Sequence, residues 1–282
     1  MKILSKKFLH PRFWPNWLGL VLMRISIYLP KSWQLFAGHS LGRLMRLFMK
    51  DRERVARRNL ELCFPEISQQ ERKELLSKNM LTMGMMPIET AISWWASDKS
   101  LEKRVEYHGL EHIHNALAKG KGVLLLTGHF TSMELGGRLI MLKQPCYVMF
   151  RELKSPLFNA VMLHQRQRHS EGTILQADMR GMLRALKKNS ATIPATARLA
   201  KMSGAAVVPY VPRRLPNGNY SIDIGPAWEN YPIGDELADA QRVNDWVEAE
   251  IKKSPTQYLW VHRRFKTQPE GKGLFYKKPK VR

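Results

Sequence analysis

The stretch that constrains the fold most is residues 122–137, which read GVLLLTGHFTSMELGG. Its apolar run, Val123–Leu126, lies between glycines, and a short apolar run bounded in this way is typical of a strand buried on both faces. From Thr131 onward the apolar residues recur with helical spacing. The stretch therefore predicts a strand, a turn and a helix in succession, and it places His129 in the turn.

The pair His129 and Glu134 is the first candidate site. Within one helix, residues five apart point about 140° away from each other, which prevents a hydrogen bond. With His129 in the turn and Glu134 in the first helical turn, the carboxylate can reach the imidazole and orient it as a general base. The simpler alternative is a turn histidine beside an acid that the helix dipole stabilises. The spacing does not match the His-Glu-x-x-His zinc motif, so we expect no metal site.

The chain carries a large excess of positive charge. Its 46 Lys and Arg against 24 Asp and Glu give a formal net charge of +22. This excess indicates an anionic partner, which can be nucleic acid, a membrane surface, a phosphorylated substrate or an acidic carrier protein. The chain is long enough, at 282 residues and 44% hydrophobic, to bury a large core. Two cysteines, Cys63 and Cys146, form no disulfide framework and indicate a reducing compartment.

The N-terminal segment, residues 1–50, combines nine Lys and Arg with several aromatic residues and contains no Asp or Glu. This mixture is typical of a segment at a membrane interface. Its apolar stretch, residues 17–29, contains Arg24 and is shorter than the about 20 residues that span a bilayer. We therefore expect a monotopic membrane anchor over 1–50, followed by one catalytic domain over 51–282. A single transmembrane helix and an ordinary core helix with a basic face are the alternatives.

The rest of the chain predicts a helical front part and then alternating strands and helices. Alternation of this kind indicates an α/β fold with helices layered on a parallel or mixed sheet. A capping box at Ser68 and Glu71 predicts one helix start. The other predicted helices are 50–63, 87–95, 110–118, 156–168, 179–188, 195–202 and 235–251, and the other predicted strands are 105–109, 146–150, 205–211, 220–224 and the start of 257–266.

Several stretches together resemble the late (secondary) acyltransferases of lipid A biosynthesis, the lauroyl, palmitoleoyl and myristoyl transferases of the lysophospholipid acyltransferase superfamily. The resemblance runs over nearly the whole chain. It implies an αβα layered acyltransferase fold with a helical, membrane-associated N-terminal region, at the cytoplasmic face of the bacterial inner membrane. The stretches that carry it are LHPRFW (9–14), RRNLELCFPE (57–66), GHFTSME (128–134), FRELKSP (150–156), SGAAVVPYVPRR (203–214) and QYLWVHRRFKTQPEG (257–271).

The resemblance also implies a reaction and its residues. His129 matches the catalytic histidine of the family and Glu134 matches its partner carboxylate, while Arg151 matches a basic residue that faces the phosphate groups of the acceptor. Lys154 and Arg166 are further cations that we expect to bind substrate. The implied reaction moves an acyl chain from an acyl carrier protein thioester to a hydroxyl of a 3-hydroxyacyl chain on a phosphorylated glycolipid, the lipid A precursor Kdo-lipid IVA. It needs no cofactor.

The chain departs from the family after Asn189. Family members continue from the preceding helix into a strand, an acidic turn and an aromatic-glycine loop, whereas Asn189 here runs directly into residues 190–198, which resemble the segment beyond that loop. We therefore expect a missing strand, a missing active-site motif and impaired activity. Two other functions stay open: an inactive relative that binds lipid without turnover, and a basic nucleic-acid-binding protein. No recognised nucleic-acid motif accompanies the charge, so we expect no nucleic-acid partner.

Overall fold

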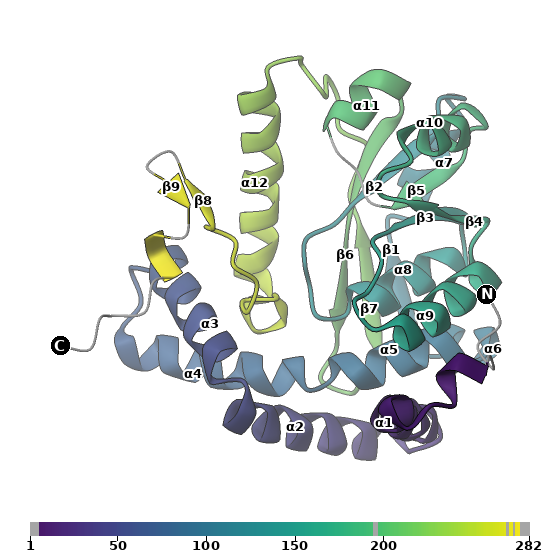
Figure 1. Ribbon diagram of the computed structural model, residues 1–282. Helices are drawn as coiled ribbons and strands as arrows, with labels where there is room; N and C mark the ends of the chain where they lie inside the picture. The colour runs from purple at the N-terminus through teal and green to yellow at the C-terminus, as the bar shows by residue number, and fades with distance from the viewer. Residues whose placement is uncertain (1–5, 194–196, 269–270, 273, 277–282) are drawn as a thin grey trace.

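The computed structural model describes residues 6–193, 197–268, 271–272 and 274–276 and is built around a mixed sheet (Figure 1). The seven strands follow the order β1-β7-β6-β2-β5-β3-β4, in which β6 and β7 are antiparallel and every other neighbouring pair is parallel. The strands are β1 (Val105–His108), β2 (Val123–Leu126), β3 (Cys146–Phe150), β4 (Gly172–Leu175), β5 (Ala191–Ile193), β6 (Ala206–Arg214) and β7 (Tyr220–Ile224).

The strand β2 lies near the middle of the sheet and is buried on both faces, as its apolar run predicts. Val123 and Leu125 belong to a hydrophobic cluster with helices on one face, and Leu124 and Leu126 belong to a second cluster on the other face. The layered α/β arrangement is thereby confirmed. The first cluster includes α5 (Met86–Trp95), α6 (Asp98–Glu102), α7 (Glu111–Leu117) and α8 (Met133–Met141), and the second includes α10 (Met179–Lys187), α11 (Ala197–Ser203) and α12 (Glu236–Lys253).

The remaining helices belong to the N-terminal part of the chain, except for α9, which follows β3. The predicted capping box is confirmed, because Ser68 and the side chain of Glu71 exchange hydrogen bonds at the start of α4. The helix α3 ends before Pro65, and α9 covers the edge of the sheet formed by β3 and β4. These helices are α1 (Trp14–Ser26), α2 (Lys31–Phe48), α3 (Lys50–Cys63), α4 (Gln69–Met83) and α9 (Pro156–His169).

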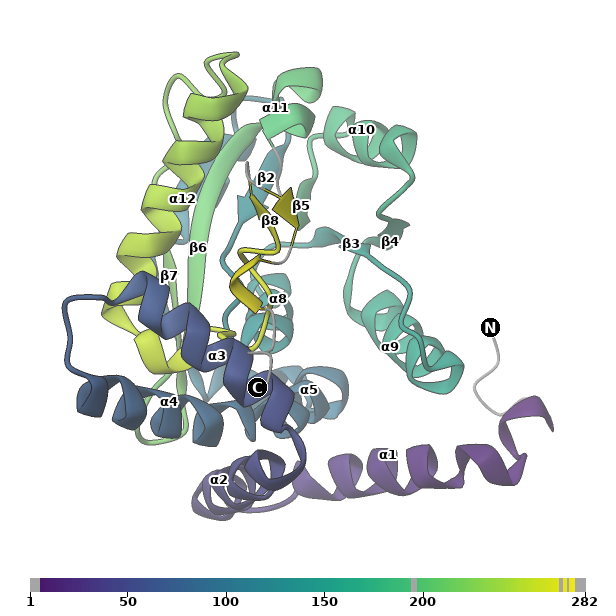
Figure 2. The same ribbon diagram turned by 60° about the vertical axis from the view of Figure 1, so that its left-hand side comes forward.

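The helices α1 and α2 lie along one end of the molecule, at the bottom of Figures 1 and 2. Met49 alone separates α2 from α3, and α2 packs against α4, so the boundary between 1–50 and 51–282 stays a prediction. In the part of the chain that the structure describes, no helix is sufficiently long and apolar to cross a bilayer.

The expected gap in the sheet after Asn189 is wrong, whereas the expected loss of activity stays a prediction. Residues Ala191–Ile193 form β5, which pairs in parallel with β2 on one side and with β3 on the other. Asn189 itself has a positive φ of 56°, and its side chain accepts a hydrogen bond from Gly122 N–H at 2.9 Å. The turn at Asn189 thus brings the next residues directly into the middle of the sheet, and the backbone of β2 keeps a partner on each side.

Three smaller expectations also differ from the structure. The edge strand β4 was not expected, because its sequence, GTIL, is short and directly follows a polar segment. The predicted strand at the start of 257–266 is wrong: Tyr258 forms only an isolated antiparallel bridge with Phe130. The predicted helix over 195–202 runs over Ala197–Ser203, and residues 195–196 lie outside the described residues.

Candidate active site at the carboxyl end of β2

The candidate site starts in the segment between β2 and α8. Here the chain is held by hydrogen bonds rather than by regular structure: Phe130 N–H donates to Gly128 O at 2.9 Å, and the buried Ser132 hydroxyl donates to Pro212 O at 3.2 Å. The helix α8 then packs tightly on β6, where a Cβ at Gly136 would lie 2.4 Å from Pro212 Cβ. The glycine lets α8 approach the sheet, which fixes where the segment with His129 leaves it.

The two residues of the predicted pair have different neighbours. Glu134 lies in the first turn of α8, where its carboxylate accepts hydrogen bonds from Arg166 Nε at 3.0 Å and from Trp94 Nε1 at 3.1 Å. A second guanidinium nitrogen of Arg166 completes a bidentate ion pair. No hydrogen bond joins Glu134 to His129 among the residues the structure describes. The expected direct contact between the imidazole and this carboxylate is therefore not formed.

The charge state of Glu134 follows from these contacts. Burial by itself raises the pKa of a carboxyl group, but the adjacent Arg166 charge and the hydrogen bonds from Arg166 and Trp94 outweigh it, so the pKa of Glu134 lies below its ordinary value. Glu134 is ionised at neutral pH. Its negative charge is matched by one guanidinium, which is the arrangement that makes a buried carboxylate tolerable.

His129 lies on the exposed side of the same segment and stacks on His262. The two imidazole rings are nearly parallel, at 4°, with their centroids 5.6 Å apart. Partial burial lowers the pKa of His129, and the positive charge of Arg264 together with His262 lowers it further. The imidazole is therefore neutral at pH 7 and able to accept a proton.

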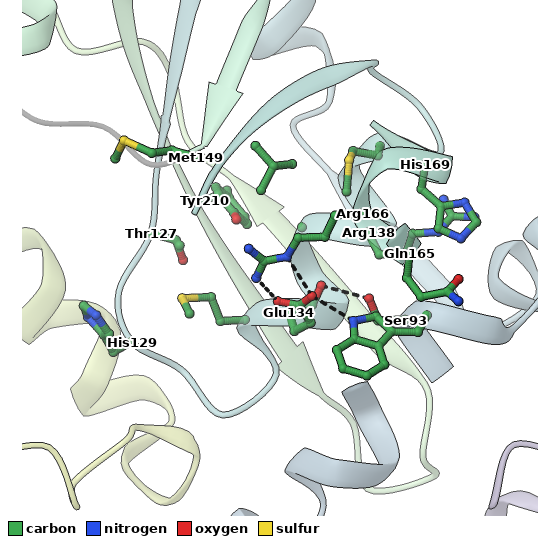
Figure 3. A pocket seen from close by; sticks show the side chains of 15 residues that line it. Ser93, Thr127, His129, Glu134, Arg138, Met149, Gln165, Arg166, His169 and Tyr210 are labelled. Carbon is green, nitrogen blue, oxygen red and sulfur yellow. Dashed lines mark hydrogen bonds and ion pairs between the residues drawn. The ribbon is translucent and has the colours of Figure 1, made fainter. Parts of the chain in front are cut away.

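His129 and Glu134 share one cavity although they do not touch (Figure 3). The cavity has a volume of about 220 Å³ and a largely apolar lining. His129 lies at its edge, apart from the central group formed by Glu134 and Arg166. The lining residues are Ser93, Trp94, Thr127, His129, Met133, Glu134, Gly137, Arg138, Met141, Val148, Met149, Gln165, Arg166, His169 and Tyr210.

Four lining residues have a buried polar atom without a hydrogen-bond partner in the described part of the chain. These atoms are Thr127 Oγ1, Arg138 Nε, His169 Nε2 and the Tyr210 hydroxyl. Buried polar groups usually have partners, so unpaired ones around a cavity are available to a ligand or to water. The cavity can accordingly hold a molecule that is mainly apolar and has a few polar atoms.

The cations expected to bind substrate lie in two different environments. Arg151 and Lys154 are exposed in the loop between β3 and α9, and neither forms an ion pair or hydrogen bond within the described ranges. Arg166 faces the cavity and is engaged by Glu134. The first two are thus free to meet an anionic ligand, whereas the third is already paired. Among the described residues, no three His, Cys, Asp or Glu side chains are grouped as metal ligands.

Sequence reasoning missed two residues of the site. Trp94 binds Glu134, but it is 40 residues away in the chain, and its helical spacing indicates only a core residue. His262 belongs to QYLWVHRRFKTQPEG, one of the matching stretches, yet no role was assigned to it. A histidine amid apolar and basic residues in that stretch was the available signal.

Comparisons with known proteins match nearly the whole chain. The profile described as "Bacterial lipid A biosynthesis acyltransferase" matches residues 1–193 and 188–267, two parts that overlap where the sequence predicts a shortened segment. The lipid A biosynthesis lauroyltransferase of Escherichia coli K12 is 36% identical over 294 residues, which cover 95% of this chain and 96% of the relative. The lipid A biosynthesis palmitoleoyltransferase of the same organism is 35% identical over 299 residues, covering 96% and 97%.

A third relative agrees with these two. The lipid A biosynthesis acyltransferase of Haemophilus influenzae is 32% identical over 295 residues, which cover 94% of each chain. All three alignments extend over more positions than the 282 residues of this chain, so the chain carries gaps relative to each of them. The profile match and the near-complete coverage show that this protein belongs to the bacterial lipid A biosynthesis acyltransferases.

Proposed function

We propose that this enzyme transfers an acyl chain from an acyl carrier protein thioester to a hydroxyl of a 3-hydroxyacyl chain on a Kdo-lipid IVA-type precursor. The observation that carries the proposal is the neutral imidazole of His129 at the edge of a largely apolar cavity, in a member of this family. His129 accepts the hydroxyl proton as the oxygen attacks the thioester carbonyl. The carbon–sulfur bond then breaks, and the proton passes to the departing thiolate.

In this proposal, Glu134 acts through its ion pair with Arg166. The bidentate pair holds the guanidinium in the wall of the cavity, close to where the reacting groups would meet. A direct role in orienting His129 requires the carboxylate to leave both Arg166 and Trp94. If Glu134 acts through Arg166, loss of Arg166 should impair the reaction. If Glu134 orients His129 directly, loss of Arg166 should leave activity near that of the parent.

The unpaired cations are assigned to the acceptor. Arg151 and Lys154 follow the carboxyl end of β3, where ligands of α/β sheets commonly bind. Exposed cations without acidic partners pair well with phosphate groups. The net charge of +22 suits an acidic carrier protein and an anionic bilayer in the same way.

The apolar stripes of α1 and α2 are assigned to the membrane. Large exposed side chains recur on α1 at residues 14, 18, 21, 22 and 25, and on α2 at 33, 36, 44, 47 and 48. This spacing places each set on one side of its helix, and cations lie on the same helices without a single acid. We infer that both helices lie in the interface at the cytoplasmic face of the inner membrane.

A sedimentation assay with vesicles of phosphatidylethanolamine and phosphatidylglycerol tests this assignment. Leu18→Glu with Leu22→Glu should lower vesicle binding by at least about tenfold, since burying each leucine contributes about 1.5–3 kcal/mol. The control is Leu237→Glu, because Leu237 is 80% exposed on α12 and lies outside both stripes. If the control variant loses binding as strongly as the double variant, the stripes are not the membrane contact.

The activity is tested with purified protein, acyl carrier protein thioesters of several chain lengths and Kdo-lipid IVA. Mass spectrometry should find an acceptor heavier by one acyl chain, and lipid A from cells lacking the gene should lack that chain. The lauroyltransferase of Escherichia coli is the positive control. If that relative is active while this protein binds the acceptor without turnover, the chain is an inactive lipid-binding member of the family.

A further inference from the structure

Residues 257–264 of the C-terminal segment have no part in the mechanism above, although they lie beside the general base. Its backbone pairs with the segment that carries His129: Leu259 N–H donates to His129 O at 2.8 Å, and Thr131 N–H donates to Gln257 O at 2.8 Å. Between these two bonds, Tyr258 forms a bridge with Phe130, and their rings pack edge to face. This pairing brings His262 onto the face of the His129 imidazole.

Two buried asparagines hold this segment in place. Asn59 on α3 donates to the carbonyls of Trp260 and His262, at 2.6 and 2.8 Å. Asn79 on α4 donates to the carbonyls of Thr256 and Tyr258, both at 2.8 Å. The side chains of both asparagines are almost completely buried, at 1% and 0% exposure. The backbone of His262 itself is thus fixed by the helical front part of the molecule.

The imidazole of His129 has few other restraints. It lies outside helix and strand, and its ring forms no hydrogen bond in the described part of the chain. The expected restraint, Glu134, is bonded to Arg166 and Trp94. The ring does pack against His262 in an offset parallel contact, and contacts of this kind favour one relative orientation of the two rings.

We infer that His262 is a positioning residue for the acyl transfer, which orients the imidazole of His129 by stacking and is itself held in place by Asn59. The inference rests on the proposed role of His129 as general base. A base displaced by about 1 Å from its productive position can cost about 100-fold in rate, so a restraint on this ring bears directly on turnover.

The stacking partner also affects the charge of the base. Besides burial, the neighbours that lower the pKa of His129 are Arg264 and His262, both on the C-terminal segment. Glu134, the acid that shares the cavity, is neutralised by Arg166. Loss of His262 should therefore move the titration of His129 to higher pH, an effect distinct from a change in ring orientation.

Two substitutions separate stacking from charge. His262→Ala removes the ring, and we expect kcat to fall about 10- to 100-fold with the KM values for both substrates unchanged. His262→Phe keeps a flat ring without a titratable group, and we expect kcat within about threefold of the parent. His114→Ala is the matched control, because His114 is an exposed histidine on α7 away from the cavity. An equal loss of kcat in the Phe and Ala variants would overturn the inference.

A second measurement does not depend on turnover. In histidine-labelled full-length protein, the His129 ring signal, assigned by its loss in His129→Ala, is followed by NMR relaxation and pH titration. We expect increased ring mobility in His262→Ala but not in His262→Phe, and a titration at higher pH in both. Unchanged mobility of the His129 ring in His262→Ala would overturn the inference, whatever the activity of that variant. If the parent shows no transfer while these NMR changes occur, the proposed reaction fails and the positioning contact stands.

Discussion

His129 and Glu134, two residues of one motif, lie in opposite environments. At the edge of the cavity, His129 is exposed, stacked on His262 of the C-terminal segment, and close to the charge of Arg264. On the wall formed by α5, α8 and α9, Glu134 is enclosed and held by Arg166 and Trp94. Positive neighbours disfavour a charge on the histidine, and a positive neighbour favours the charge on the carboxylate. The environment of His129 therefore favours a neutral base, and that of Glu134 favours a fixed ion pair.

This difference shows that His129 and Glu134 are close in the sequence but do not interact directly. A histidine and an acid five residues apart suggest a catalytic dyad, but here the acid completes its hydrogen bonds with more distant residues. The difference also predicts how the two residues respond to substitution. Changes at His129 should alter the reaction and leave stability unaffected, whereas changes at Glu134 should alter both.

The largest effect is expected for His129→Ala. Loss of the general base should lower kcat about 100- to 10,000-fold, which is the range that general-base assistance contributes. The melting temperature should stay close to that of the parent, because the side chain is exposed and forms no hydrogen bond within the described residues. Turnover of acyl carrier protein thioester and a thermal melt of the same preparation check this. Parent-like turnover in the Ala variant would remove His129 from the reaction.

Glu134→Gln is expected to have a smaller effect on the rate and a larger effect on stability. It leaves the Arg166 charge enclosed without a counter-ion, which should lower the free energy of unfolding by about 2 kcal/mol. This value is below the range for completely buried pairs because both side chains are about one-fifth exposed. We expect kcat to fall about tenfold through displacement of groups in the cavity wall.

A double-mutant cycle with Arg166→Met sharpens this prediction. If Glu134 acts through Arg166, the two single variants should lose similar activity, and the double variant should lose little more than either. Urea unfolding and turnover are measured on all four proteins. Near-parent activity of Arg166→Met beside a strongly impaired Glu134→Gln would instead favour direct contact between the carboxylate and His129.

The pH dependence tests the environment of the base. The pKa of His129 lies below 6.5, so kcat/KM should stay high on lowering the pH to 6.5 and fall only below that value, as the imidazole gains a proton. The unfolded chain binds this proton more readily than the folded chain, so the free energy of unfolding should also decrease in the same direction.

Removal of a neighbouring charge should move this acid limb. In Arg264→Met the limb should shift to higher pH, because one of the positive groups that disfavour the imidazolium is lost. Arg242→Met is a matched control, since Arg242 and Arg264 are both exposed and each lies over an aromatic ring, at 5.0 and 5.4 Å. A shift of equal size in both variants would show that net charge, and not proximity to His129, is responsible.

Local sequence patterns were sufficient for the central unit of the fold and insufficient for the partners of the site. The apolar run and glycines around β2 act within a few residues, and they predicted the strand, the turn and the helix. The partners of Glu134 come from 32 and 40 residues away, and no spacing rule reaches that far. The position of His129 in the turn was predictable, but its restraint depends on how the C-terminal segment folds back.

The strand β5 shows why a shortened segment is hard to interpret from sequence. The expectation of a gap assumed that residues after Asn189 keep the positions of the family residues they resemble. The positive φ at Asn189 instead turns the chain into the sheet at once, and three residues suffice to pair with β2 and β3. The backbone N–H and C=O groups of β2 and β3 need hydrogen-bond partners, which favours a strand between them. A comparison of sequences does not show this need.

The smallest effect is expected for Trp94→Phe, which removes one hydrogen bond from Glu134 and leaves its ion pair with Arg166. The indole is 4% exposed and its Nε1–H lies 3.1 Å from Oε1, so we expect a loss of about 1 kcal/mol in the free energy of unfolding and less than about threefold in kcat. Trp95→Phe is the control, because Trp95 packs against Trp94 at 5.5 Å and forms no hydrogen bond with Glu134. Urea unfolding and turnover are measured on both variants. If Trp94→Phe reduces kcat as strongly as Glu134→Gln, then the reaction depends on the orientation of the carboxylate rather than on its ion pair with Arg166.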